Sequence, residues 1–297
     1  MKLTTSFGLA AGLVALATAC NGTENPDPSG SGGSAVGVGG AATGGAATGG
    51  KAATGGAATG GATAVAGGSS VDCSTPMPTG GTVHNYTGNW STDNGTAYGL
   101  GWGMWSNGTG GSLTSFANAH AFAASWNNSS NFLAHLGLDF NPPKVYTAYG
   151  TILAQFLEIK SGTAGGFSMI GMYGWMHSPC IEWYINEDSY NGMHGSGSLT
   201  ATIDGATYYL SSAMTTGTGG ANACESGHTG SWRQMISTRA TARQCGTITV
   251  SDHFAAWAAQ SSWGGLGTLT SVHINVETGG GVGSIQFPVA NVTTTSN

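Results

Sequence analysis

The chain has 297 residues, of which 53 are glycine, and only 7% of its residues are charged. Its formal net charge is −6, and it has no run or patch of Lys and Arg, so the composition argues against nucleic acid as a partner. A surface so poor in charge suits a neutral polymer, and nine Trp and nine Tyr supply flat faces that can stack on rings.

Residues 1–20 have the pattern of an export signal. Lys2 is the positive start, Phe7–Leu16 is a short apolar core, and Ala17-Thr18-Ala19 is a small-residue cleavage site. Cys20 follows directly, as in bacterial lipoproteins, although Ala17 stands where Leu is commonest. We expect a secreted or cell-surface protein, held as a bacterial outer-membrane lipoprotein through a lipid on Cys20. The alternative is an ordinary signal peptide with a cysteine nearby.

Residues 21–70 are expected to be a disordered Gly/Ala/Thr-rich linker. The unit Ala-Ala-Thr-Gly-Gly occurs four times between Ala41 and Gly61. Such a segment buries too little apolar area to offset its chain entropy. About 50 Gly-rich residues have a mean reach of roughly 40 Å, enough to hold a domain away from a membrane.

Residues 71–297 are expected to form one all-β domain. Short segments rich in Thr, Tyr, Trp, Val and Ile alternate with Gly, Asn and Ser clusters, which is typical of a sandwich or barrel. The expected strands include 120–126, 166–173, 181–185, 199–203, 207–210, 247–250, 271–276 and 284–289. A single helix is expected over Asp252–Gln260, capped by Asp252, with Phe254, Trp257, Ala258 and Ser261 on one face and Gly264-Gly265 as its end.

Two glutamates stand out because they lie inside strand patterns rather than in turns. Period-2 alternation puts Glu182, Tyr184 and Asn186 on one face of a strand, opposite Ile181, Trp183 and Ile185. The same rule puts His273, Asn275 and Glu277 on the face opposite Val272, Ile274 and Val276. The bland interpretation is two solvated faces. Two such carboxylates in an acid-poor chain instead favour glycoside hydrolysis, which needs a carboxyl pair flanking the bond.

The sequence around these glutamates resembles glycoside hydrolase family 11, the small jelly-roll xylanases. The segment Tyr-Gly-Trp-Met-His-Ser-Pro-Cys-Ile-Glu-Trp-Tyr-Ile-Asn from Tyr173 is similar to the family's nucleophile segment, and Val-Glu-Thr-Gly-Gly-Gly-Val-Gly-Ser from Val276 to its acid/base segment. Ser125–Phe132 and Asp252–Trp257 resemble a strand and the only helix of the family. The resemblance covers about residues 100–290. It implies a two-sheet β jelly-roll sandwich with one α-helix and a long substrate cleft.

The resemblance also implies a role for each matching residue. Glu182 would be the nucleophile and Glu277 the general acid/base of a retaining endo-1,4-beta-xylanase. The substrate-binding residues would be Trp105, stacking on a sugar; Asn131, beside Glu277; Tyr173, bonded to the nucleophile and to the sugar ring it attacks; Tyr184, helping to position that nucleophile and sugar; and Gln234. Trp175, Trp126 and Arg239 are more typical of scaffold. The partner would be xylan or a related β-1,4-linked plant polysaccharide, bound by a monomer.

Three departures leave other functions open. Met214 stands where the family usually has a cleft Arg, the loop from Thr215 to Trp232 appears longer and differs in sequence, and Gly279 stands where a Tyr is usual. Another β-1,4-glycanase on this fold, or a non-catalytic carbohydrate-binding jelly-roll, are therefore alternatives. The paired glutamates argue against the latter.

The cysteines and histidines suggest disulfides but no metal. Besides Cys20, the chain has Cys73, Cys180, Cys224 and Cys245, and an oxidising compartment makes two disulfides plausible. Cys224–Cys245 is the expected pair because the two could close a hairpin and stiffen the loop. Four buried thiols are the alternative. The histidines are scattered without His-x-x-x-His spacing, so no metal or cofactor is expected.

Overall fold

A computed structural model of the chain describes residues 70–86, 91–108, 110–215 and 231–296. The predicted signal segment with Cys20, the predicted linker up to residue 69 and residues 216–230, which include Cys224, lie outside the described residues. The fold that follows is therefore that of the predicted β domain.

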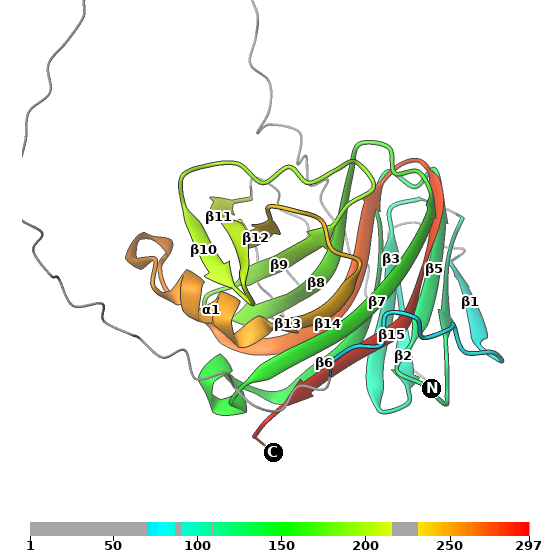
Figure 1. Cartoon of the computed structure of the whole chain (residues 1–297), viewed down its shortest axis with the longest axis horizontal. Helices are drawn as coiled ribbons and strands as arrows, with labels where there is room; N and C mark the ends of the chain where they lie inside the picture. The colour runs from blue at the N-terminus through cyan, green and yellow to red at the C-terminus, as the bar shows by residue number, and fades with distance from the viewer. Residues whose placement is uncertain (1–69, 87–90, 109, 216–230, 297) are drawn as a thin grey trace, which may run out of the picture. The chain divides into compact units, whose positions relative to one another are not determined.

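The described chain forms two stacked β-sheets (Figure 1). The six-stranded sheet has, in spatial order, β1 (Thr82–Tyr86), β4 (Gly111–Ser115), β5 (Phe122–Asn127), β15 (Val282–Thr294), β7 (Ile152–Gly162) and β13 (Cys245–Thr249). The nine-stranded sheet has β10 (Thr200–Ile203), β11 (Ala206–Met214), β12 (Arg233–Arg239), β9 (Ile181–Asp188), β8 (Phe167–His177), β14 (Thr268–Gly279), β6 (Phe132–Val145), β3 (Leu100–Ser106) and β2 (Ser91–Ala97). Neighbouring strands are antiparallel except β12 and β9, which are parallel. This confirms the predicted two-sheet jelly-roll.

Alternation along the strands separates two buried layers. Ile181, Trp183 and Ile185 of β9 belong to the main core between the sheets, together with alternate residues of β14 such as Ile274. The opposite face of the same sheet carries a second, smaller cluster of mostly aromatic side chains. Its buried members are Leu133, Met169, Tyr173, Trp175, Cys180, Tyr184 and Trp232. Because side chains alternate with period 2, one strand can serve the core and this second layer at once.

Helix α1 (Val250–Ala258) is the single α-helix of the described ranges, beside the short 3-10 turns η1 (Tyr146–Tyr149) and η3 (Ser261–Trp263). It begins two residues earlier than predicted, with Thr249 at its N-cap, so the predicted cap at Asp252 is wrong. The Asp204 carboxylate accepts hydrogen bonds from the Thr249 amide and hydroxyl, at 2.8 and 2.7 Å, and fixes this start.

The buried face of α1 also differs from the predicted one. Its buried residues are Val250, His253, Phe254 and Trp257, whereas Ala258 and Ser261 are exposed. The starting point at Val250 shifts the i, i+3, i+4, i+7 stripe accordingly. Phe254 packs edge-on against Trp183 at 4.9 Å, which anchors the helix to β9. Gly264 ends the turn η3 rather than α1, with φ 80°.

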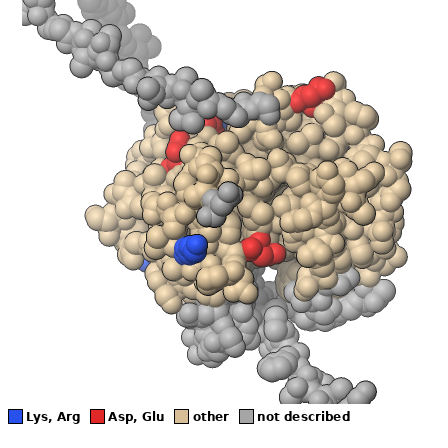
Figure 2. All heavy atoms as spheres, turned by 90° about the horizontal axis from the view of Figure 1, so that it is seen from below, with Lys and Arg blue, Asp and Glu red and all other residues tan. Residues whose placement is uncertain are grey.

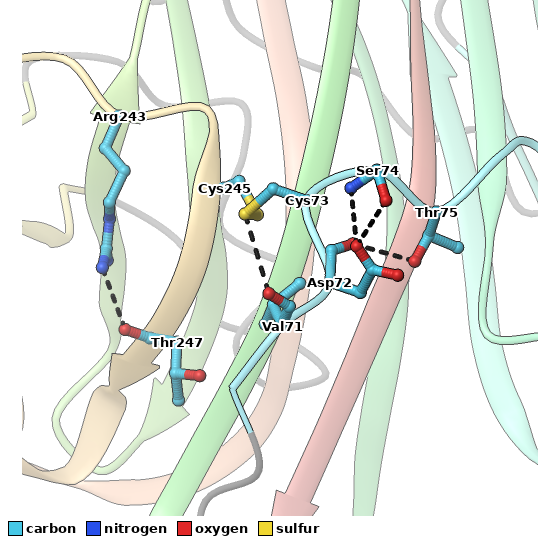
Figure 3. The surroundings of a disulfide bond; sticks show 8 residues. All are labelled: Val71, Asp72, Cys73, Ser74, Thr75, Arg243, Cys245 and Thr247. Atoms are coloured by element: carbon cyan, nitrogen blue, oxygen red, sulfur yellow. Dashed lines mark hydrogen bonds between the residues drawn. A yellow bond between two sulfur atoms is a disulfide. The ribbon is translucent and has the colours of Figure 1, made fainter.

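A disulfide joins Cys73 to Cys245, so the predicted Cys224–Cys245 pair is wrong (Figure 3). The turn around Cys73 is fixed locally: Asp72 Oδ1 accepts hydrogen bonds from the amide and the hydroxyl of Ser74, at 2.9 and 2.6 Å. Cys180 is disulfide-bonded as well. The Cys73–Cys245 bond joins residues that are 172 positions apart in the sequence, so no local pattern could indicate this pairing.

None of the described helices is both long enough and apolar enough to cross a membrane.

Candidate active site

Adjacent strands of the nine-stranded sheet bring the predicted site residues together. Glu182 and Tyr184 come from β9, Tyr173 from β8 and Glu277 from β14, and these strands are neighbours in this order. Gln234 of β12 lies directly opposite Glu182 in the parallel register. The remaining predicted residues come from the other side of β14: Asn131 precedes β6, and Trp105 lies on β3. Glu182 and Glu277, 95 positions apart in the sequence, therefore share one face.

The Tyr184 hydroxyl connects the two carboxyl groups. It lies 2.9 Å from Oε1 of Glu182 and 2.7 Å from Oε2 of Glu277. These two carboxyl oxygens are therefore separated by at most the sum of the two distances, about 5.6 Å. Carboxyl pairs of retaining glycosidases lie about 5–5.5 Å apart, and those of inverting enzymes about 6.5–9.5 Å apart. The bridge fits the shorter spacing.

Glu182 is surrounded by hydrogen-bond donors although its side chain is buried. Its Oε2 accepts from Gln234 Nε2 at 2.7 Å and from Trp232 Nε1 at 2.9 Å, while Oε1 faces the Tyr184 hydroxyl. Burial raises the pKa of Glu182 above its ordinary value, and these three donors lower it. A carboxylate that accepts several hydrogen bonds is stabilised in its charged form.

Glu277 has fewer donors and a more strongly raised pKa. It contacts the Tyr184 hydroxyl and accepts from Asn131 Nδ2, at 2.9 Å through Oε1. Burial first, and the nearby Glu182 carboxylate second, raise the pKa of Glu277 to about 7. Both pKa values are raised, but Glu277, with fewer donors, can hold a proton near neutral pH, whereas the three donors around Glu182 favour its charged form.

Tyr173 lies in the site, but its bonding differs from the prediction. Within the described residues, its hydroxyl accepts a hydrogen bond from Trp175 Nε1 at 2.5 Å, and the donors to Glu182 are the three named above. Its ring lies 5.2 Å from that of Tyr184. Burial and the two nearby glutamates raise the pKa of Tyr173, so it stays a neutral phenol. Trp105 is partly buried and packs against the same aromatic cluster.

Trp232 was not predicted as a site residue. Sequence inspection assigned it only to the end of a divergent loop. Its one available signal was that it stands two residues before Gln234, and so on the same strand face. Trp126 and Arg239, expected to be scaffold, are engaged elsewhere: the Trp126 indole bonds Thr163 O at 3.1 Å, and Arg239 lies near Glu187.

A second polar group lies near the glutamates on the same sheet face. His135 of β6 and His273 of β14 stack with ring centroids 4.1 Å apart, and His273 Nε2 lies 2.9 Å from Asp139 Oδ1. Burial, and then His273, hold the pKa of His135 well below its usual range. Within the described residues, no group of three or more His, Cys, Asp or Glu side chains could hold a metal ion.

Two close carboxyls of unequal pKa, set among aromatic rings on one face of a jelly-roll sheet, are the arrangement of a glycoside hydrolase. Comparison with protein families matches residues 97–287 to Glycosyl hydrolases family 11. The chain belongs to this family.

Individual relatives agree with the family. The chain is 40% identical over 198 residues to endo-1,4-beta-xylanase S20 of Neocallimastix patriciarum, covering 64% of this chain and 57% of the relative. It is 30% identical to endo-1,4-beta-xylanase C of Fibrobacter succinogenes, covering 64% of this chain and 31% of that protein. The solved family 11 xylanase from Neocallimastix patriciarum superposes with a TM-score of 0.62 at 30% identity, covering 72% of this chain and all of that one. The chain thus spans 31% to 57% of the length of these curated relatives.

Proposed function

We propose that the chain is a retaining endo-1,4-beta-xylanase that hydrolyses xylan by double displacement. The observation that carries the proposal is the Tyr184 hydroxyl between the two carboxyls, because it keeps one oxygen of each within about 5.6 Å of the other, which fits the spacing of retaining enzymes. Family membership and the printed names of the relatives support xylan as the substrate.

In the first step, Glu182 is the nucleophile. A carboxylate oxygen of Glu182 attacks the anomeric carbon, and Glu277 gives its proton to the glycosidic oxygen, which leaves as the alcohol of the departing sugar. In the second step, Glu277, now ionised, takes a proton from water. The hydroxide oxygen forms the new bond to the anomeric carbon, and Glu182 departs as a carboxylate. Two inversions retain the configuration.

The surrounding residues support these two roles unequally. Three donors around Glu182 favour the charged nucleophile, and a pKa of about 7 lets Glu277 hold its proton near neutral pH. We propose that Asn131 tunes the proton affinity of Glu277, while Gln234 and Tyr184 orient the carboxyls. Tyr173 and Trp105 would contact the sugars from the same aromatic face.

The surface suits an uncharged substrate. On the face in Figure 2, acidic and basic side chains are few and scattered over an otherwise uncharged surface. A polymer of neutral sugars is held mainly by ring stacking and hydrogen bonds, so it needs no complementary field.

The test is a sugar-release assay on xylan, cellulose and mixed-linkage glucan, with Glu182→Gln as the inactive control. Release from xylan alone, with the β-anomer as the first product by NMR, is the expected result. Release from cellulose or mixed glucan instead would favour another β-1,4-glycanase. Met214, which replaces the family's usual cleft Arg and is 52% exposed at the end of β11, is the reason for testing these substrates. Binding without release would mean a carbohydrate-binding module.

We also propose that the protein is exported, with residues 1–20 as a lipoprotein signal, Cys20 as the lipid-bearing residue, and residues 21–70 as a flexible tether to the bacterial outer membrane. The motif at Cys20 and the repeated Ala-Ala-Thr-Gly-Gly units support this. Mass spectrometry of the mature N-terminus decides: a diacylglyceryl cysteine is expected, and an unmodified start downstream of Cys20 would indicate a freely secreted enzyme.

A further inference from the structure

The most informative group outside the predicted site is the indole of Trp232. We propose that Trp232 is a positioning residue for the hydrolytic reaction. Its indole N–H donates a hydrogen bond to Oε2 of Glu182, and this orients the carboxylate so that Oε1 faces Glu277. The inference rests on the proposed function in that it takes Glu182 as the nucleophile.

The hydrogen bonds divide the Glu182 carboxylate into two unlike oxygens. Oε2 accepts two N–H donors, Trp232 Nε1 and Gln234 Nε2, at 2.9 and 2.7 Å. Oε1 contacts the Tyr184 hydroxyl, which is also 2.7 Å from Glu277. A glycosidic bond cut by both glutamates lies between them, so Oε1 is the oxygen on the substrate side. Two N–H donors on one oxygen also prevent the carboxylate from rotating about its terminal bond.

Trp232 is itself held rigidly, as a positioning residue must be. Its backbone amide donates to Thr215 Oγ1 at 3.0 Å, and its carbonyl accepts from the Thr215 amide at 2.9 Å. The indole is 2% exposed and packs against Trp175, with ring centroids 5.9 Å apart. Thr215, the first residue after β11, thus holds the backbone of Trp232, and the contact with Trp175 holds its ring.

The chemistry of this contact follows from its burial. Glu182 is only 8% exposed, so its carboxylate depends mainly on protein donors. A hydrogen bond to an ionised acceptor is stronger than one to a neutral acceptor, so the indole favours the charged carboxylate. It therefore acts twice in each turnover: it keeps Glu182 ionised before attack, and it stabilises the carboxylate that leaves in the second step.

The decisive variant is Trp232→Phe, which removes the N–H and keeps an aromatic ring. We expect the acidic limb of the kcat/KM profile to move to higher pH by about one pH unit, because loss of one charge-assisted bond weakens the ionised form by about that much. We also expect kcat on an activated aryl xylobioside, for which release of Glu182 limits the rate, to fall about 10-fold or more.

Trp257→Phe is the matched control. Trp257 is an equally buried tryptophan, 1% exposed on α1, whose indole N–H has no acceptor among the described residues. It should leave the acidic limb in place. If Trp232→Phe leaves the limb where it is, or both variants move it equally, Trp232 is only packing and the inference is wrong.

A substrate-free measurement separates this inference from the proposed function. In protein carrying carboxyl-¹³C glutamate, the Glu182 signal is identified by its loss in Glu182→Gln, and its titration midpoint should rise in Trp232→Phe but not in Trp257→Phe. In unsubstituted protein, one indole ¹⁵N–H signal should shift with the Glu182 midpoint, which keeps the test available if Trp232→Phe does not fold. If no indole ¹⁵N–H chemical shift changes with the Glu182 midpoint, the inference is wrong even if xylan is cut. Absence of xylan cleavage overturns the function alone.

Discussion

At the scale of single residues, Tyr184 constrains which protons the site can hold. A hydroxyl carries one hydrogen, so it can donate fully to only one of the two carboxyls it touches. It can also accept from Glu277 when that carboxyl is protonated. The arrangement is therefore satisfied best with a single proton on Glu277 and a charge on Glu182, which is the state that the unequal pKa shifts favour.

The two glutamates should respond differently to loss of charge. Glu182→Gln should lower turnover by about 10⁴-fold or more, because no nucleophile remains, while xylan binding persists. Glu277→Gln should be as damaging on xylan, but should spare the first step on an aryl xyloside whose leaving group needs no proton. Burst kinetics on both substrates measure this. Equal losses on the two substrates would contradict the acid/base role of Glu277.

Asn131 should control the basic limb of the pH profile. Its amide donates to Glu277 and so favours the ionised form, which lowers the pKa of that carboxyl. Asn131→Ala removes this donor, so the pKa of Glu277 should rise from its value of about 7 and the basic limb of kcat/KM should move to higher pH. Gln286→Ala, on an exposed position of β15, is a control that should leave the limb in place. A limb that moves to lower pH in Asn131→Ala would contradict the assignment.

Sequence reasoning identified these residues because strand alternation is local. Glu182 and Glu277 could be assigned to polar faces from their immediate neighbours, and the resemblance supplied Asn131, Tyr184 and Gln234. The bond from Trp232 to Glu182 could not be predicted in this way, because it depends on how β12 lies beside β9. The partner of the Tyr173 hydroxyl depends likewise on side-chain rotation, which alternation does not specify.

At the scale of elements, β7 and β9 bury a group of carboxyls away from the active site. Glu187 is fully buried, lies 2.7 Å from Arg243 Nε and accepts from the Tyr208 hydroxyl at 2.5 Å. Asp188 pairs with Lys160 at 2.5 Å. Glu158, 2% exposed, has no such cationic contact among the described residues, and burial, with the neighbouring Asp188 second, raises its pKa well above the usual value.

Glu158 should therefore make stability fall as the pH rises. An acid whose pKa is higher in the folded state than in the unfolded state binds more protons when folded, so unfolding becomes easier once the pH exceeds the unfolded value of about 4.5. Glu158→Gln removes this slope. From pH 5 to pH 8, the Tm of the variant relative to that of the unsubstituted protein should rise by roughly 2–4 °C. Calorimetry across that range is the measurement, and parallel Tm curves would contradict the prediction.

The elements themselves were predicted unevenly. Strands with dense Val, Ile, Tyr and Trp, such as β9, β14 and β15, were expected because such residues favour a pleated, half-buried surface. β6 continues through Pro142 and Pro143, which cannot donate to a ladder, so its far end has no local signal. The start of α1 was misplaced because its cap involves Asp204, which lies 45 residues earlier in the sequence.

At the scale of the whole molecule, the Cys73–Cys245 disulfide should contribute strongly to stability. By restricting the unfolded chain, a closed loop of 172 residues raises the free energy of the unfolded state by up to about 5 kcal/mol at 25 °C. Replacing both cysteines by alanine should lower Tm by roughly 10–20 °C, measured by calorimetry. Activity at 25 °C should remain, since neither cysteine contacts the glutamates. Non-reducing peptide mapping should recover the two cysteines in one linked peptide, and any other pairing would contradict the assignment.

The same bond also decides where tension enters the domain. β1 and β13 are the opposite edges of the six-stranded sheet, and Cys73 precedes β1 whereas Cys245 opens β13. A pull on the chain ahead of Cys73 is passed covalently to β13, so it bypasses β1 and cannot peel that strand from β4 one residue at a time. An enzyme that is pulled while bound to a fibre would therefore keep β1 paired with β4. If the disulfide were reduced, the same pull would act on β1 directly, and unfolding would begin there.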